Sequence, residues 1–96
     1  MNLTNHAKVR QGQRGISTEL IETALTYGRL IRVRDGEGFY LGVQEVRQAR
    51  ARGLDLRRAK NVQVIVGHDG SVITCYRTAR PAREWTRRRG SSRGCR

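Results

Sequence analysis

Residues 62–77 read VQVIVGHDGSVITCYR, a pattern typical of a β-hairpin. Two runs rich in β-branched residues flank Asp69-Gly70, a dipeptide that suits a two-residue type I′ turn. Counting outward from this turn pairs His68 with Ser71, Val66 with Ile73, Val64 with Cys75 and Val62 with Arg77. This face is mostly apolar and is expected to meet helices. The opposite face then carries Gln63, Ile65, Val72, Thr74 and Tyr76, which helices need not cover.

Two helices are predicted before the hairpin. The first spans Leu3–Arg14, and the second spans Thr18–Tyr27, where apolar residues recur at the spacing of one buried stripe. Polar residues and glycines at the expected ends favour these bounds, because they satisfy the free backbone groups of a helix. The expected caps are Thr4 or Asn5 and Gly15 for the first helix, and Ser17 and Gly28 for the second.

Between the helices and the hairpin the apolar period changes from 3.6 to 2. This predicts a strand at Leu30–Arg34, a turn at Asp35–Gly38 and a returning strand at Phe39–Gly42. Residues 44–59 are less regular, although Val43, Val46 and Ala49 have helical spacing. Gly53 could end that helix, and Leu54–Leu56 could lead back to the sheet. The expected fold is α+β, with two N-terminal helices packed on one face of a roughly four-stranded antiparallel sheet.

The chain is short and strongly basic. Its 96 residues allow one domain, and 20 basic against 8 acidic residues give a net charge of +12. No apolar run is long enough to span a membrane, and no secretory signal is recognised, so we expect a cytoplasmic protein without membrane contact. Two cysteines are too few for a disulfide framework or a zinc site, and we expect no metal or cofactor.

The basic residues concentrate near the C-terminus. Residues 77–96 hold eight arginines against one acidic residue, Glu84, and therefore carry +7 of the net charge. Their only large apolar side chain is Trp85, which is too little to offset the cost of ordering the segment. We therefore predict a single domain at residues 1–78 and a flexible Arg-rich tail at residues 79–96.

Three motifs resemble a family of small bacterial proteins. They are the opening His6-Ala7-Lys8-Val9-Arg10, the helix start Arg14-Gly15-Ile16-Ser17, and the closing hairpin around Asp69-Gly70-Ser71-Val72-Ile73-Thr74. That family is similar to the BrnT and RelE/ParE toxins, which are grouped with barnase-like and colicin-like ribonucleases. The resemblance covers about residues 4–78. It implies a RelE-like fold and metal-independent RNA cleavage of toxin–antitoxin type, although ParE-like relatives act on a protein target instead.

The matching positions suggest how cleavage would proceed. His6 could move protons near neutral pH, and Arg10 could hold phosphate oxygens bidentately. Thr74 could donate to a phosphate oxygen, while Tyr76 could stack on a base or act as acid or base. Each also has a structural explanation. His6 could cap a helix, and Arg10 could lie on a solvated face. Thr74 and Tyr76 are residue types that commonly form strands.

The remaining arginines are candidate contacts to nucleic acid, because each phosphate that they neutralise releases counterions. The candidates are Arg14, Arg77, Arg80, Arg83, Arg87, Arg88 and Arg89. His68 is expected to be an ordinary residue beside a hairpin loop, and Cys75 an unreactive core residue.

Three functions therefore remain open. The first is a metal-independent ribonuclease of toxin type, whose partners would be RNA and an acidic antitoxin protein. The second is a non-catalytic RNA-binding or ribosome-associated module that uses its basic surface alone. The third is an inhibitor of a protein target. A paucity of aromatic residues, 5% of the chain, counts against a stacking platform like that of RNA-recognition motifs.

Overall fold

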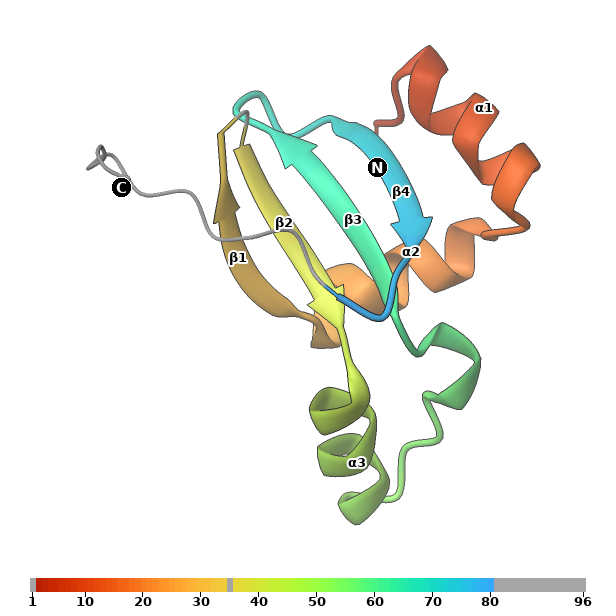
Figure 1. Ribbon diagram of the computed structural model, residues 1–96, viewed down its shortest axis with the longest axis vertical. Coiled ribbons are helices and arrows are strands. Elements are labelled where there is room, and N and C mark those ends of the chain that lie inside the picture. Colours follow the sequence, from red (N-terminus) through yellow and green to blue (C-terminus); the bar gives the residue numbers. More distant parts are fainter. Residues whose placement is uncertain (1, 35, 81–96) are drawn as a thin grey trace.

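The fold is a four-stranded antiparallel sheet that two helices precede in the sequence, with a third helix between its second and third strands (Figure 1). The computed structural model describes residues 2–34 and 36–80. Two helices come first, α1 (Asn5–Arg14) and α2 (Thr18–Tyr27), and the strands β1 (Arg29–Val33) and β2 (Gly36–Leu41) follow. Next come helix α3 (Val43–Ala51), the 3-10 turn η1 (Arg57–Ala59), and the strands β3 (Val62–Gly67) and β4 (Val72–Arg77). The strands pair in sequence order, β1-β2-β3-β4, so the predicted α+β architecture is confirmed.

Helix α2 has the predicted bounds, and α1 ends at Arg14 as predicted but begins at Asn5. Thr4 caps α1 by accepting a hydrogen bond from the Ala7 amide at 3.2 Å, and Gly15 ends it with a left-handed φ of 63°. Ser17 and Gly28 bound α2. The prediction was wrong for Leu3, because this residue forms a parallel bridge to Val72 and extends the sheet edge instead of the helix.

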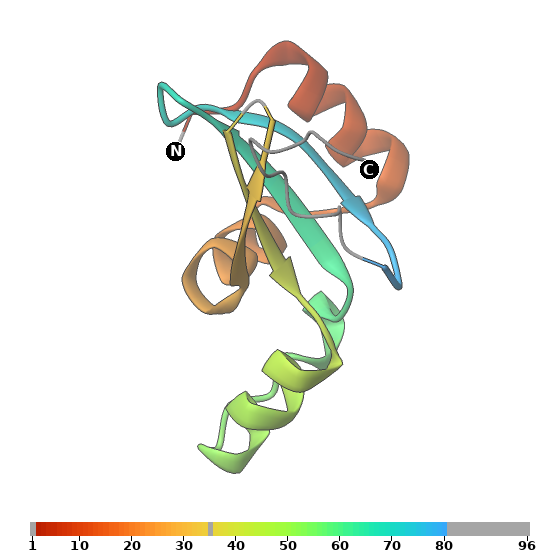
Figure 2. The same cartoon turned by 60° about the vertical axis from the view of Figure 1, so that its left-hand side comes forward.

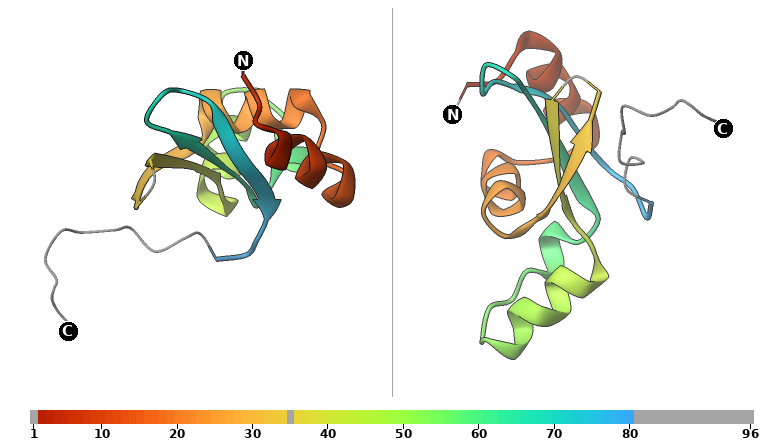
Figure 3. Two further views of the ribbon diagram at one scale, coloured as in Figure 1. Left: turned by 90° about the horizontal axis from the view of Figure 1, so that it is seen from above. Right: turned by 90° about the vertical axis from the view of Figure 1, so that its left-hand side faces the viewer.

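Both N-terminal helices pack on one face of the sheet. Figure 3 shows α2 on that face and no described helix on the other. Apolar residues of the two helices and their linker meet one row of the hairpin, with each side chain at most 2% exposed. The members of this core are Ala7, Ile16, Ile21, Ala24, Val62, Val64, Val72 and Cys75. Cys75 is therefore a core residue, as predicted.

The loop of the β3–β4 hairpin is one residue longer than predicted, and Val72 consequently lies on the other face of the sheet. Gly67 donates to the Ser71 carbonyl oxygen at 2.9 Å, which leaves a three-residue loop, and Gly70 takes a left-handed φ of 87°. The pairings of Val62 with Arg77 and Val64 with Cys75 are confirmed. Beyond them a register shift pairs Val66 with Val72, so the predicted pairings of Val66 with Ile73 and of His68 with Ser71 were wrong.

This irregularity is a β-bulge at Ile73. One extra residue in β4 moves the side chain on the loop side of the bulge to the other face of the sheet. Val72 is therefore 1% exposed in the core, although the sequence placed it on the open face. Thr74 and Tyr76 follow the bulge in the chain and lie opposite Ile65 and Gln63, so they keep their predicted place on the face without helices.

The middle of the chain is also corrected. The second strand begins at Gly36 and not at Phe39, and Gly42 precedes helix α3 instead of closing the strand. The first strand lies one residue earlier than predicted, and η1 intervenes before the chain returns to the sheet. Figure 2 shows α3 and η1 extending beyond one end of the sheet. A second small core of Leu41, Val46 and Ala59, with Leu20 and Leu56, holds them there.

Two glycines should respond oppositely to alanine. At Gly36 a Cβ would clash with the Val66 carbonyl oxygen of the neighbouring strand, so Gly36→Ala is expected to lower the free energy of unfolding by about 3 kcal/mol. At Gly12, inside α1, a Cβ meets nothing within 4 Å. Gly12→Ala should therefore raise that free energy by about 0.5–1 kcal/mol. Urea denaturation followed by circular dichroism measures both, and equal effects would contradict this account.

Candidate nucleic-acid interface

The α1 candidates form a polar stripe on the outer surface of the helix. Arg10 Nε lies 3.4 Å from His6 Nε2, and Arg10 Nη1 lies 3.5 Å from Gln13 Oε1. His6 is exposed, whereas its neighbour Ala7 is buried against the sheet. This contact shows that His6 and Arg10, four residues apart in the sequence, lie on one face of α1. We call His6, Arg10 and Gln13 the α1 stripe.

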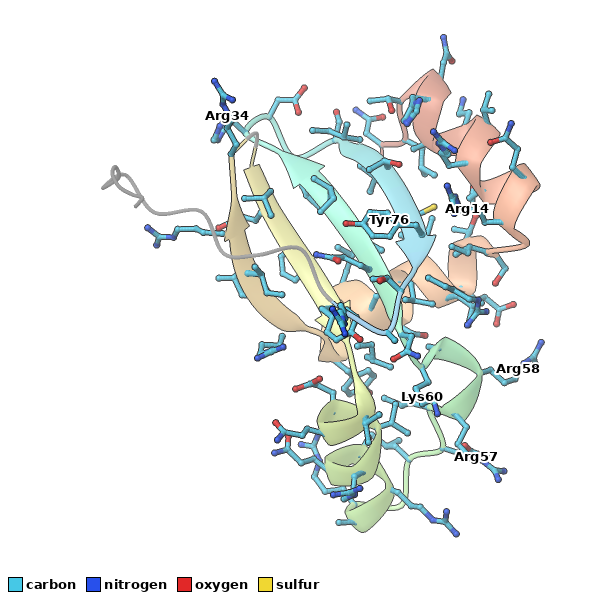
Figure 4. All side chains as sticks on the ribbon, viewed as in Figure 1. Arg14, Arg34, Arg57, Arg58, Lys60 and Tyr76 are labelled. Carbon is cyan, nitrogen blue, oxygen red and sulfur yellow. The ribbon has the colours of Figure 1, made fainter. Side chains whose placement is uncertain are left out.

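Arg14, the last residue of α1, does not belong to the α1 stripe, because its side chain lies on the side of the helix near the sheet. Figure 4 shows its side chain reaching from the end of α1 to the side of β4. Its positive charge opposes the effect of burial on the Cys75 thiol, although burial dominates and raises the pKa of that thiol. A buried thiol with a raised pKa is a poor nucleophile. Arg14 itself is exposed, so its guanidinium is accessible to a phosphate.

Thr74 and Tyr76 are half-buried on the face of the sheet without helices. Burial raises the pKa of the Tyr76 phenol, so this group is protonated at neutral pH. Tyr76 can then donate a hydrogen bond or stack on a base, but it is unsuited to act as a general base.

The structure separates the α1 stripe from Tyr76. The start of α1 is attached to the beginning of β4, where Thr4 donates through its amide to the Val72 carbonyl oxygen at 3.0 Å and through its hydroxyl to that of Ile73 at 3.0 Å. Tyr76 lies three residues further along β4 than Ile73, about 10 Å from it at ~3.3 Å per residue. Within the described chain no hydrogen bond joins His6 or Arg10 to Thr74 or Tyr76. The four predicted catalytic residues therefore form two groups.

Arg77 has a structural contact that the sequence does not reveal. Its guanidinium donates to the Arg58 carbonyl oxygen at 3.1 Å and to the Lys60 carbonyl oxygen at 3.3 Å, which ties β4 to η1. These contacts bring four exposed basic residues to one end of the sheet. We call this set the η1 cluster: Arg57, Arg58, Lys60 and Arg77.

Within the η1 cluster the four cations are not equally available. Arg57 Nη2 forms a 2.9 Å ion pair with Asp55 Oδ2, and the hydrogen bonds from Arg57 lower the pKa of Asp55 to about 2. Arg58 and Lys60 have no carboxylate partner in the described part of the chain. Figure 4 shows Arg57 and Arg58 pointing away from the sheet. Sequence reasoning missed these residues, although the run Arg57-Arg58-Ala59-Lys60 was a usable signal.

The last described residues, beside the η1 cluster, form a turn that is held by hydrogen bonds. The Thr78 amide donates to the Asn61 carbonyl oxygen at 2.8 Å, and the Tyr40 hydroxyl lies 2.9 Å from the Thr78 carbonyl oxygen. The Thr78 hydroxyl in turn accepts from the Arg80 amide at 3.1 Å. Arg80, a predicted contact, is therefore held near the end of β4. The predicted tail lies outside the described residues from residue 81 on, as do the candidates Arg83, Arg87, Arg88 and Arg89.

The described residues offer no metal-binding cluster of three or more His, Cys, Asp or Glu side chains. No helix among them combines the length and the apolar character needed to cross a membrane. What the described surface does offer is guanidinium and ammonium groups, which suit phosphate oxygens.

Comparison with known proteins gives one match. Residues 3–77 match the family described as "Domain of unknown function (DUF4258)". No curated protein and no solved structure matches the chain. The relation to RelE-like and BrnT-like toxins therefore stays a prediction from the motifs.

Proposed function

We propose that this protein, which belongs to the DUF4258 family, binds RNA. The residues that would contact the RNA are the η1 cluster, Arg14 and Arg80. The observation that carries this proposal is the gathering of exposed cations at the end of β4, where Arg58 and Lys60 have no carboxylate partner among the described residues. A further Arg-rich segment continues from this end in the sequence. A polyanion is the ligand that best fits such a surface, because phosphate contacts dominate nucleic-acid affinity.

RNA is favoured by the side chains beside these cations. Tyr76 lies half-buried on the open face next to Arg77 in sequence, and its neutral phenol can stack on an unpaired base. Helices α1 and α2 both pack against the sheet, so they do not form a helix-turn-helix pair with one helix free to enter a major groove. Single-stranded RNA is therefore the preferred ligand.

Neutralising two cations of the η1 cluster tests the proposal. The double variant Arg58→Gln with Lys60→Gln is expected to weaken the binding of a labelled single-stranded RNA by about 10-fold at ~0.15 M salt, since each lost phosphate contact costs about 3- to 4-fold there. Fluorescence anisotropy measures the affinity. The matched control is Arg32→Gln with Arg34→Gln, which removes the same charge at the other end of the sheet. Equal losses in the two variants would show that only net charge matters.

A second candidate function is RNA cleavage without a metal, favoured by the contact between His6 and Arg10. In the free protein Arg10 Nε points at His6 Nε2 at 3.4 Å, so this nitrogen is the acceptor of that contact. A phosphate that draws the Arg10 guanidinium to itself would release the lone pair of Nε2. The imidazole could then take the proton of a ribose 2′-hydroxyl while Arg10 stabilises the charge on phosphorus.

In that reaction the 2′-oxygen bonds to phosphorus, the bond to the 5′-oxygen breaks, and the leaving oxygen takes up a proton from the imidazolium or from water. The products are a 2′,3′-cyclic phosphate and a 5′-hydroxyl end. A ribonuclease of toxin–antitoxin type would be kept inactive by an acidic antitoxin, whose carboxylates would fit the same cationic surface.

A further inference from the structure

A second cationic site lies at the opposite end of the sheet. There the end of β1 and the start of β2 line an open cavity of about 620 Å³ together with Gly67, which ends β3, and His68, which follows it. Figure 4 shows Arg34 at this end, far from the labelled residues of the η1 cluster. The lining residues are Arg32, Val33, Arg34, Gly36, Glu37, Gly67 and His68.

The charges of this cavity favour an anion. Among the described residues that line the cavity, two guanidinium groups and one imidazole accompany one carboxylate, that of Glu37, which lies opposite Arg32 in the pairing of β1 with β2. Across residues 2–34 and 36–80, neither Arg32 nor Arg34 forms an ion pair or a side-chain hydrogen bond. Both side chains are exposed and available to a ligand. Their situation differs from that of Arg57, which is engaged by Asp55.

The backbone around the cavity is held in place before any ligand arrives. Gly36 packs so closely on the Val66 carbonyl oxygen that a Cβ there would clash. On the other side, the Gly70 amide donates to the Gly67 carbonyl oxygen at 3.0 Å, and Asp69 Oδ1 accepts from the Ser71 amide at 3.0 Å. His68 therefore projects from an ordered loop. A pre-organised site loses less entropy on binding.

We infer that this cavity binds the phosphate monoester of a small hydroxyl-bearing molecule, such as a sugar phosphate or a nucleotide. Guanidinium groups grip phosphate oxygens in bidentate fashion, and the imidazole of His68 can add a donor. Glu37 at the same rim can accept hydrogen bonds from sugar hydroxyls. The volume lies within the range of small-molecule sites, roughly 300–1,000 Å³. This site is independent of the RNA surface proposed above.

Titration of the full chain with ribose 5-phosphate tests the inference. We expect saturable binding by calorimetry, and amide chemical-shift changes in NMR spectra that centre on Gly36, Gly67 and His68. Arg32→Gln with Arg34→Gln should weaken binding by about 10-fold or more for each arginine lost. Arg32→Lys with Arg34→Lys keeps the charge without the bidentate geometry and should retain part of the affinity. Circular dichroism establishes that each variant is folded.

The control is Arg58→Gln with Lys60→Gln, which should bind ribose 5-phosphate as the wild type does even if RNA binding is lost. Two sources of the phosphate are separated by comparing oligoribonucleotides with a 5′-phosphate and a 5′-hydroxyl end. A preference for the 5′-phosphate that depends on Arg32 and Arg34 assigns the site to RNA ends, whereas binding of ribose 5-phosphate alone assigns it to a free metabolite. The inference is overturned if ribose 5-phosphate does not bind, or binds equally well to the glutamine variant.

Discussion

Raising the salt concentration from about 50 to about 200 mM is expected to weaken the binding of this protein to single-stranded RNA by about 10³-fold. The net charge of +12 is the reason, because the binding of basic side chains to phosphates releases counterions. If about seven of the basic residues meet phosphates, the logarithm of the binding constant falls with a slope of about −5 against the logarithm of the salt concentration. Anisotropy titrations at several salt concentrations measure this slope.

The contribution of the Arg-rich segment can be separated within the same experiment. Changing Arg87, Arg88 and Arg89 to glutamine removes three charges outside the described residues and should reduce the slope by about 2. The Arg58→Gln and Lys60→Gln double variant should reduce it by about 1.4 on the same basis. A slope near zero for the wild type would remove the electrostatic basis of the proposed function. An unchanged slope in the triple variant would place the contacts on the folded domain alone.

The helices were predictable from the sequence because their ends are fixed by local chemistry. Thr4 and Ser17 each accept a hydrogen bond from an amide of the helix that they begin, and Gly15 adopts the left-handed conformation that the sequence expects. Such contacts span three or four residues and need no knowledge of the tertiary structure. Helix α3 was harder to delimit, because Gly42 has no side chain with which to cap it. Glu45 instead accepts from the Gly42 amide at 2.9 Å.

The hairpin shows why a register is less predictable than a strand. Asp69-Gly70 fits a two-residue turn, but it also fits a three-residue loop that ends in a left-handed glycine, and the two alternatives differ by one residue. The bulge at Ile73 compensates for part of this difference. Its position depends on contacts that are remote in sequence, since Thr4 bonds to the Ile73 carbonyl oxygen across 69 positions. Val72 consequently faces the core, against the prediction.

The candidate site was predictable only in part for the same reason. The contact between His6 and Arg10 follows from their spacing of four residues on one helix. The distance between α1 and Tyr76 depends on how the helix is attached to the sheet, and the tie between Arg77 and η1 depends on backbone carbonyl groups. Neither arrangement has a signature in the sequence.

Replacing His6 with alanine is expected to lower the rate of RNA cleavage in EDTA by about 10²- to 10⁴-fold, if the second candidate function holds. The loss reflects removal of the group that takes the proton from the ribose 2′-hydroxyl. RNA affinity should change little, because the η1 cluster remains intact. End-labelled RNA measures the rate, and discrete fragments that end in a cyclic phosphate identify the reaction. An absence of cleavage by the wild type, with RNA binding retained, would leave the binding function alone.

Tyr76→Phe is the variant that locates the cleavage site. Tyr76 and His6 belong to different groups, and the raised pKa of the Tyr76 phenol excludes it as a base at neutral pH. Tyr76→Phe keeps the ring for stacking and should therefore change the cleavage rate by less than about 10-fold, well below the effect of a lost general acid or base. Gln13→Ala, on the same stripe as His6, controls for disturbance of α1 and should also have a small effect. Equal losses from Tyr76→Phe and His6→Ala would instead require α1 and β4 to act on one phosphate, which means that the bound state brings the two groups closer than the free protein does.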